Sequence, residues 1–284
     1  MRFAKVYVEI TNVCNLRCSF CPKTRRAPRF LSEEEFRTIL IRLRGWTEYV
    51  YFHLMGEPLL HPDLPRFLEL AGQMGFRVIL TTNSTLLDRV GETLLSAPAL
   101  HKVNLSLQAF EANEELDPEA CLLRCAAFAK AAARKGILIN LRLWNLDGDG
   151  TAGKNQLNDR LLSLLHGEFP GPWQPSRGGE RLSERIYLTP AETFRWPDLA
   201  GTEINADHGC YGLRDQIGVL SDGTVVPCCL DHEGDVPLGN LLREYMEEIL
   251  SRPRTRAMIE GFRQGRAVEP LCERCGYANR FSAK

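Results

Sequence analysis

The sequence predicts an α/β fold built on a parallel sheet. Two observations support this prediction. Short apolar segments alternate with amphipathic segments from residue 5 to about residue 145, and the stretches between the apolar segments are long enough to hold helices. Repeated strand–helix units give parallel strands joined by right-handed crossovers. Ligands of such folds collect at the carboxyl ends of the strands, so we expect functional residues there.

The elements are predicted in chain order. Strands are expected at 5–10, 49–54, 76–81, 101–107 and 137–143, with a sixth at 185–188. Helices are expected at 32–44, 63–74, 86–96, 118–135 and 157–165, and the first opens with the capping box Ser32-Glu33-Glu34-Glu35. A second unit begins at His208, with strands at 216–220 and 224–227 around the hairpin turn Ser221-Asp222-Gly223 and a helix at 241–250. We therefore predict two domains, residues 1–207 and 208–284.

The composition is that of a globular protein and excludes several classes of function. The chain has 284 residues, 44% of them hydrophobic, and a formal net charge of −1, so net charge does not support nucleic-acid binding. No apolar run reaches the roughly 18 to 20 residues of a membrane span. Lys5 and Glu9 interrupt the first apolar stretch, which argues against a signal peptide. In a cytoplasmic protein, ten cysteines predict metal ligands or buried thiols and not disulfides.

Three cysteines lie close together directly after the first predicted strand. Cys14, Cys18 and Cys21 are separated by three and two residues, and the next cysteine, Cys121, follows a hundred residues later. Iron–sulfur clusters are normally held by four thiolates. Three thiolates on one loop therefore leave one iron of a four-iron cluster open to another ligand. The spacing predicts chemistry at the metal, with three buried or zinc-binding cysteines as the alternative.

The segment Cys14-Asn15-Leu16-Arg17-Cys18-Ser19-Phe20-Cys21 resembles the signature of the radical S-adenosylmethionine (radical SAM) enzymes, which have an aromatic residue before the third cysteine. The resemblance implies a partial (β/α)6 TIM-like barrel. It also implies that the three cysteines hold a [4Fe-4S] cluster whose open iron is chelated by S-adenosylmethionine (SAM). Reductive cleavage of SAM would give a 5′-deoxyadenosyl radical that abstracts a substrate hydrogen, and the electron would come from an external flavodoxin- or ferredoxin-type reductant.

Met55-Gly56-Glu57-Pro58 looks like the Gly-Gly-Glu-Pro motif of that family, with Met55 in place of the first glycine. By this resemblance the Glu57 carboxylate accepts hydrogen bonds from the SAM ammonium group, and Gly56 lets the backbone approach the ligand. The resemblance implies further SAM contacts: Phe20 at the adenine, Asn83 and Ser106 at the methionine and ribose, and Arg142 at the carboxylate. For Asn83, Ser106 and Arg142, the alternative is an ordinary polar residue at the end of a strand.

A second set of cysteines lies in the C-terminal unit. Cys210, Cys228, Cys272 and Cys275 resemble the ligands of the auxiliary-cluster domain of radical SAM enzymes, called SPASM in its full form and twitch in its one-cluster form. Four thiolates would close a second [4Fe-4S] cluster, which could conduct electrons or stabilise the fold. A zinc site with four cysteine ligands is the alternative. Cys229 could replace its neighbour Cys228 as a ligand.

Other cysteines and a basic segment have simpler readings. Cys121 and Cys125 share one face of a predicted helix, where core packing is favoured over metal binding. The basic segment after the cysteine triplet is read as a solvated loop, with recognition of an anionic substrate as the alternative; it contains Lys23, Arg25, Arg26 and Arg29.

The sequence thus predicts a two-cluster radical SAM enzyme that oxidises or otherwise modifies its substrate. A small molecule is favoured over a peptide, protein or nucleic acid, because no N-terminal extension is present to bind a leader peptide. Residues 145–207, with Trp144 and Trp173, are the candidate substrate-facing region. A non-catalytic iron–sulfur electron carrier and a zinc-stabilised binding protein are the alternatives.

Overall fold

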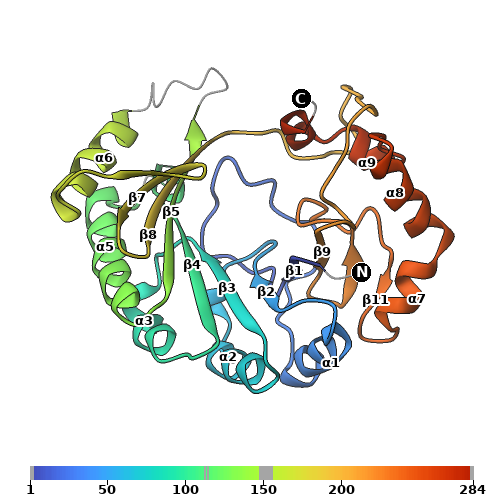
Figure 1. The fold of residues 1–284 in the computed structure, drawn as a ribbon, viewed down its shortest axis with the longest axis horizontal. Helices are drawn as coiled ribbons and strands as arrows, with labels where there is room; N and C mark the ends of the chain where they lie inside the picture. Colours follow the sequence, from blue (N-terminus) through green and yellow to red (C-terminus); the bar gives the residue numbers. More distant parts are fainter. Residues whose placement is uncertain (1–2, 112, 114, 147–155, 282–284) are drawn as a thin grey trace.

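The computed structural model describes residues 3–111, 113, 115–146 and 156–281. The described residues form one sheet with the strand order β11-β10-β9-β1-β2-β3-β4-β5-β8-β7-β6. Figure 1 shows this sheet as an open arc with helices on its outer side. The segment between β1 and α1 lies inside the arc, where it faces the concave side of the sheet.

The described elements have the following bounds. The strands are β1 (Lys5–Val8), β2 (Tyr49–Phe52), β3 (Arg77–Thr82), β4 (Leu100–Ser106), β5 (Leu138–Leu146), β6 (Gln174–Ser176), β7 (Gly179–Ser183), β8 (Ile186–Glu192), β9 (Gln216–Val219), β10 (Thr224–Val226) and β11 (Gly239–Asn240). The helices are α1 (Glu33–Leu43), α2 (Leu64–Gln73), α3 (Leu87–Leu95), α4 (Gln108–Glu111), α5 (Pro118–Arg134), α6 (Gln156–Glu168), α7 (Met246–Ser251), α8 (Pro253–Arg263) and α9 (Pro270–Glu273), with 3₁₀ turns at Pro58–Leu60 and Gly276–Arg280.

Six parallel strands form the predicted partial (β/α)6 barrel, which is open and not closed. They are β1, β2, β3, β4, β5 and β8, paired in that order. The sixth strand is the one expected near residues 185–188, and it pairs in parallel with β5. The hairpin β6–β7 was not expected. It extends the sheet beyond β8 with antiparallel pairing.

The alternation of residues along each strand separates two environments. One side of the sheet carries apolar residues such as Val6, Phe52 and Leu80, which are fully buried beneath the helices. Helix α1 is fixed at its start by the predicted capping box: the Ser32 hydroxyl accepts from the Glu35 N–H at 3.2 Å, and the Glu35 carboxylate accepts from the Ser32 N–H at 2.9 Å. The concave side carries polar residues such as Asn104 and Asn140, which are hydrogen-bonded to each other, next to a small buried cluster around Tyr7 and Leu54.

The sheet continues across the expected boundary between residues 207 and 208. Strand β9 pairs in parallel with β1, from Lys5 opposite Gln216 to Val8 opposite Val219. Strands β10 and β11 then add antiparallel strands at that edge. The division into two domains therefore stays a prediction, and the C-terminal region is joined to the barrel by a backbone ladder. Among the described helices, none has the length and apolar character needed to span a membrane.

Candidate active site at two cysteine clusters

The cysteine loop leaves the carboxyl end of β1 and returns to it. Thr11 forms a bridge with Phe30, and its hydroxyl donates to the Arg29 carbonyl at 2.8 Å. The Asn12 side chain donates to the Ala27 carbonyl at 2.9 Å and accepts from the Arg29 N–H at 2.8 Å. These bonds hold the ends of the loop together, so Cys14, Cys18 and Cys21 are presented on one closed segment.

N–H groups point at the thiols of the cysteine loop. The Cys14 sulfur accepts from the Leu16 N–H at 3.4 Å and from the Asn83 amide at 3.9 Å, and the Cys18 sulfur accepts from the Asn113 amide at 3.3 Å. Burial raises the pKa of the Cys14 thiol to about 11, and the nearby Glu57 adds to this rise. Hydrogen bonds to sulfur are one means by which proteins stabilise cluster-bound thiolates. The donors present therefore fit a thiolate-held cluster.

The turn after β2 lies directly against this loop. The Glu57 N–H donates to the Val13 carbonyl at 2.8 Å. The Glu57 carboxylate is 1% exposed and accepts from the Thr82 hydroxyl at 2.7 Å, the Asn83 N–H at 2.7 Å and the Leu59 N–H at 3.0 Å. Burial nonetheless raises its pKa to about 7, although these three hydrogen bonds act in the opposite direction. Glu57 is thus a preorganised acceptor beside the cysteine loop.

Gly56 lies against the backbone of the cysteine loop, a contact that the sequence did not indicate. A Cβ at this position would lie 2.3 Å from the Thr11 carbonyl oxygen and 2.9 Å from the Asn12 Cα, and the residue has a φ of +75°. The close approach is therefore between the turn and the backbone of the cysteine loop, not only between the turn and a ligand.

Replacing Gly56 with alanine is expected to push the turn off the cysteine loop. The backbone cannot yield as a flexible side chain would, and a left-handed φ adds strain for any side chain. We expect a destabilisation of about 2–3 kcal/mol and a loss of SAM binding, measured by denaturant unfolding and by titration with SAM. Gly75, which has a φ of +82° and open space around it, is the matched control. Similar losses of stability and SAM binding in Gly56→Ala and Gly75→Ala would contradict this assignment of the effect to the close contact.

The other residues expected at SAM lie on different segments: Asn83 after β3, Ser106 and Arg142 on β4 and β5, and Phe20 on the cysteine loop. Asn83 joins Glu57 to the cysteine loop, since its amide also donates to the Asn15 side chain at 2.9 Å. Ser106 ends β4 and lies opposite Arg142 of β5 in the register of the sheet. The Phe20 ring is 40% exposed, and its carbonyl accepts from the Trp196 indole at 3.1 Å.

Arg142 lies beside Trp144, and no Asp or Glu of the described residues is among the causes that shift its pKa. Its guanidinium stands 4.4 Å from the centre of the Trp144 ring, and its Nε is buried without a hydrogen-bond partner. Burial lowers its pKa to about 10, while neighbouring Tyr7 and Cys229 act in the opposite direction. The same guanidinium helps burial to lower the pKa of Lys102. The concave face therefore carries positive charge, at Arg142 and Lys102.

The four C-terminal cysteines expected as auxiliary ligands line one pocket. The wall includes Cys210, Cys228, Cys272 and Cys275 together with Tyr277. Burial raises the pKa of all four thiols. No group of His, Cys, Asp and Glu side chains among the described residues converges closely enough for a single metal ion. An iron–sulfur cluster does not require four thiolates to meet at one point, because each of its irons takes its own thiolate.

Cys228 and Cys229 point in different directions. Cys228 lines the pocket with the other three thiols. Cys229 instead packs with Tyr7 and Leu54, and a hydrogen bond between the Tyr7 hydroxyl and its thiol contributes to the pKa of both groups. The geometry therefore favours Cys228 as the auxiliary ligand.

The basic segment is only partly the solvated loop that the sequence suggested: Lys23 and Arg25 are exposed, whereas Arg26 and Arg29 are held by other parts of the chain. Arg26 makes two hydrogen bonds to the buried Glu9 carboxylate, at 2.8 and 2.7 Å. Arg29 pairs with Glu35 and donates to the Ser221 carbonyl. Only the Arg25 side chain of these three is largely exposed. The arginines were misread because their acidic partners are distant in sequence or belong to a helix cap.

Of the two tryptophans expected near the substrate, one lies elsewhere. Trp173 stacks on His166 of α6, with ring centres 3.8 Å apart, and its indole donates to the Phe169 carbonyl. It therefore packs against the helix that precedes it. Residues 147–155 of the expected substrate-facing region lie outside the described residues. Cys121 and Cys125 are buried in the core, as predicted from their position on α5.

Sequence reasoning missed three residues that the structure places around the cysteine loop. Asn113 contacts the Cys18 sulfur, Trp196 contacts the Phe20 carbonyl, and Glu9 binds Arg26. Glu9 had a visible signal, because it is an acid at the end of a buried strand just before the cysteine loop. Asn113 and Trp196 lie on segments without a motif, so their sequence carries no comparable signal.

The chain matches two family models. Residues 8–136 match the radical SAM superfamily, and residues 210–276 match an iron–sulfur cluster-binding domain, SPASM. The GTP 3′,8-cyclase of Chlorobaculum tepidum is 37% identical over 91% of this chain and 87% of its own length, and that of Microcystis aeruginosa is 25% identical over 89% of each.

Solved structures share the fold at lower identity. BtrN in complex with AdoMet and 2-DOIA has a TM-score of 0.64 at 18% identity, covering 97% of this chain and 93% of that one. SuiB of Streptococcus suis has a TM-score of 0.63 at 17% identity, covering 97% and 71%. The cofactors that follow from the two matched domains are SAM, a [4Fe-4S] cluster and an auxiliary iron–sulfur cluster. The SPASM match removes the zinc alternative for the C-terminal cysteines. The chain belongs to the radical SAM superfamily and carries a C-terminal SPASM domain.

Proposed function

We propose that this protein cleaves SAM reductively at a cluster held by Cys14, Cys18 and Cys21 and uses the radical to abstract a substrate hydrogen. The observation that carries the proposal is the contact between the cysteine loop and the turn after β2, where the Glu57 N–H bonds the Val13 carbonyl. This contact puts an acceptor carboxylate beside the cysteine loop, where it would be close to the iron that three thiolates leave open. An electron carrier would need neither the open iron nor the acceptor.

The protein's own residues would bind and orient the cofactor. When bound, the cluster and SAM supply a 5′-deoxyadenosyl radical. Glu57 would accept from the SAM amino group, and Asn83 would fix Glu57 through its N–H while its amide contacts the Cys14 sulfur. Phe20, Gly56, Ser106 and Arg142 complete the proposed SAM site. Trp196 would shield it, since its indole is bonded to the Phe20 carbonyl.

The auxiliary cluster would be held by Cys210, Cys228, Cys272 and Cys275, which line one pocket. With four thiolates it has no free iron for a substrate. We propose that it accepts the electron left on the substrate radical, so that the net reaction is an oxidation or a modification that requires one. The first electron would come from an external flavodoxin- or ferredoxin-type protein.

We propose a small anionic molecule as substrate, and GTP is the first compound to test. The relatives named GTP 3′,8-cyclase support this choice, and so does the charge of the concave face. Among the described residues, no Asp or Glu forms an ion pair with Lys102 or Arg142. The SAM carboxylate would balance Arg142, and an anion from the substrate would balance Lys102.

The test is a reconstitution under anaerobic conditions. The protein should bind about eight irons with matching sulfide, and it should form 5′-deoxyadenosine when reduced in the presence of SAM. Addition of GTP should increase that rate if GTP is the substrate, whereas ATP serves as the control. Clusters without any SAM cleavage would favour the electron carrier and overturn the proposal. Cleavage that does not respond to GTP would remove GTP only.

SAM binding should strengthen as the pH rises through about 7. Burial raises the pKa of Glu57 to about 7, against roughly 4.3 in an unfolded chain. Below pH 7 it is mostly protonated, and accepting the SAM amino group requires the carboxylate, so binding releases a proton. Calorimetry at pH 6 in two buffers of different ionisation enthalpy measures this release. Glu57→Gln should release fewer protons, and equal release in the two proteins would contradict the assignment.

A further inference from the structure

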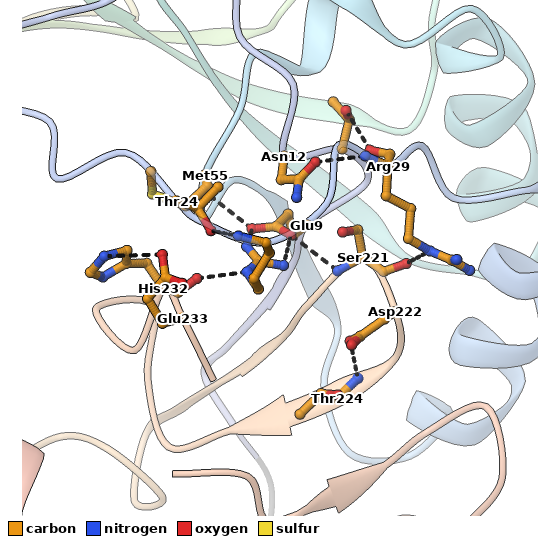
Figure 2. Close-up of polar contacts among 12 residues, drawn as sticks. Glu9, Asn12, Thr24, Arg29, Met55, Ser221, Asp222, Thr224, His232 and Glu233 are labelled. Atoms are coloured by element: carbon orange, nitrogen blue, oxygen red, sulfur yellow. Dashed lines mark hydrogen bonds and ion pairs between the residues drawn. The ribbon is translucent and has the colours of Figure 1, made fainter. Parts of the chain in front are cut away.

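The Glu9 carboxylate is a buried junction between three segments of the chain. It is 1% exposed at the carboxyl end of β1. It accepts from both terminal nitrogens of Arg26 at 2.8 and 2.7 Å, from the Met55 N–H at 3.2 Å and from the Ser221 N–H at 3.1 Å. Figure 2 shows the lines from Glu9 to Met55 and Ser221. One side chain therefore joins the cysteine loop, the turn after β2 and the hairpin turn of the C-terminal region.

A second set of contacts surrounds this junction. The Arg26 Nε donates to the His232 carbonyl at 2.9 Å, and the Arg25 N–H donates to the Glu233 carboxylate at 3.0 Å. The Arg29 Nε donates to the Ser221 carbonyl at 2.6 Å (Figure 2). The return arm of the cysteine loop is thus fixed to the C-terminal region at three further points.

The Glu9 carboxylate needs compensating partners, and these partners fix its position. A buried carboxylate must be paired and hydrogen-bonded, because an uncompensated charge in the interior is strongly destabilising. Charge-assisted bonds to a guanidinium fork are directional. With four donors around it, the Glu9 carboxylate has little freedom to move, so each donor is held in a fixed position relative to the other three.

The position of Met55 gives the junction a consequence for the cofactor. Met55 directly precedes Gly56 and Glu57, and Gly56 packs on the backbone of Thr11 and Asn12. A displacement of the Met55 N–H would therefore move Glu57 relative to Cys14. A purely structural ion pair would need only Arg26; the bonds to Met55 and Ser221 are the additional observation.

We propose that Glu9 is a positioning residue for SAM. Through its hydrogen bonds to Met55 and Arg26, it fixes the position of the Met55–Glu57 turn relative to the cysteine loop. Through Ser221, it links that position to the C-terminal region. The inference rests on the proposed role of Glu57 at SAM. Glu9 itself does not touch the cofactor.

The test uses Glu9→Gln in the full reconstituted protein. The amide keeps the volume of the side chain, but its NH2 group faces N–H donors. We expect both clusters to load, with about eight irons, and the apparent KM for SAM to rise about 10- to 100-fold, with a smaller change in kcat. The electron paramagnetic resonance spectrum of the reduced first cluster should respond less to SAM than in the wild type. Glu33→Gln is the matched control, because Glu33 pairs with Arg37 and Arg66 at the surface.

Two more variants, Arg26→Lys and the double variant Glu9→Gln with Arg26→Gln, test whether Glu9 positions the turn or only balances charge. Arg26→Lys keeps the positive charge but loses the paired hydrogen bonds of the guanidinium to Glu9. It should raise the KM for SAM by a smaller factor than that expected for Glu9→Gln, and it serves as the test if Glu9→Gln does not fold. Glu9→Gln combined with Arg26→Gln removes both charges, so it should recover stability while the KM for SAM stays high. Full recovery of the KM in the double variant would show charge balance alone and overturn the inference. Wild-type KM and spectra in Glu9→Gln and Arg26→Lys would overturn it as well, whereas failure of the wild type to cleave SAM would count against the proposed function.

Discussion

Replacing Cys14, Cys18 and Cys21 together with alanine is expected to abolish the formation of 5′-deoxyadenosine and to lower the iron content from about eight to about four per chain. The expected result follows from the position of the three thiols on one closed loop, beside the Glu57 carboxylate. Without them no iron can be presented to SAM. The remaining iron should belong to the auxiliary cluster, whose cysteines line a separate pocket.

The control for this variant is Cys125→Ala. Cys125 is fully buried in the core, and burial raises the pKa of its thiol to about 12. Its loss should cost on the order of 1 kcal/mol in the free energy of unfolding and leave iron content and SAM cleavage unchanged. Iron and sulfide analysis together with chromatography of 5′-deoxyadenosine measure both variants. Residual cleavage in the triple variant would mean that another site generates the radical.

Cys228→Ala is expected to lose the auxiliary cluster, whereas Cys229→Ala is expected to keep it. The two residues are adjacent in sequence, but only Cys228 lines the pocket with Cys210, Cys272 and Cys275, while Cys229 packs with Tyr7. The first variant should hold about four irons and still cleave SAM. It should release little oxidised product, because the substrate radical has lost its electron acceptor.

The adjacent pair makes this comparison unusually well matched. Both variants remove one thiol from the same loop, so a general loss of stability would affect them alike. Spectroscopy of the reduced proteins distinguishes the two clusters. Full loading of both clusters in Cys228→Ala, or loss of the second cluster in Cys229→Ala, would reverse the assignment of the ligand.

The repeated part of the fold could be predicted because its signals are local. Strand β2 alternates Tyr49, Val50, Tyr51 and Phe52 between the two faces of the sheet, and helix α1 opens with a capping box within four residues. The hairpin β6–β7 escaped prediction because its segments are short and polar, and its pairing with β8 supplies the order that its composition does not.

The site was predictable only as far as its motifs extend. The cysteine spacing and the Gly56-Glu57 turn pointed to positions that the structure brings together. The partners of Arg26 and Arg29 did not follow from sequence, since Ser221 lies 192 residues from Arg29 and Glu9 precedes the cysteine loop. Likewise, adjacent cysteines at 228 and 229 cannot be told apart until the direction of each side chain is known.

The pairing of β9 with β1 has a consequence for the solubility of the chain. Without β9, the backbone N–H and C=O groups of β1 from Lys5 to Val8 would lack partners on one side, next to the apolar residues Val6 and Val8. An open, apolar strand edge is a template for aggregation. The C-terminal region therefore protects the first strand from pairing with other copies, so a chain ending before residue 208 would lose this protection together with its second cluster.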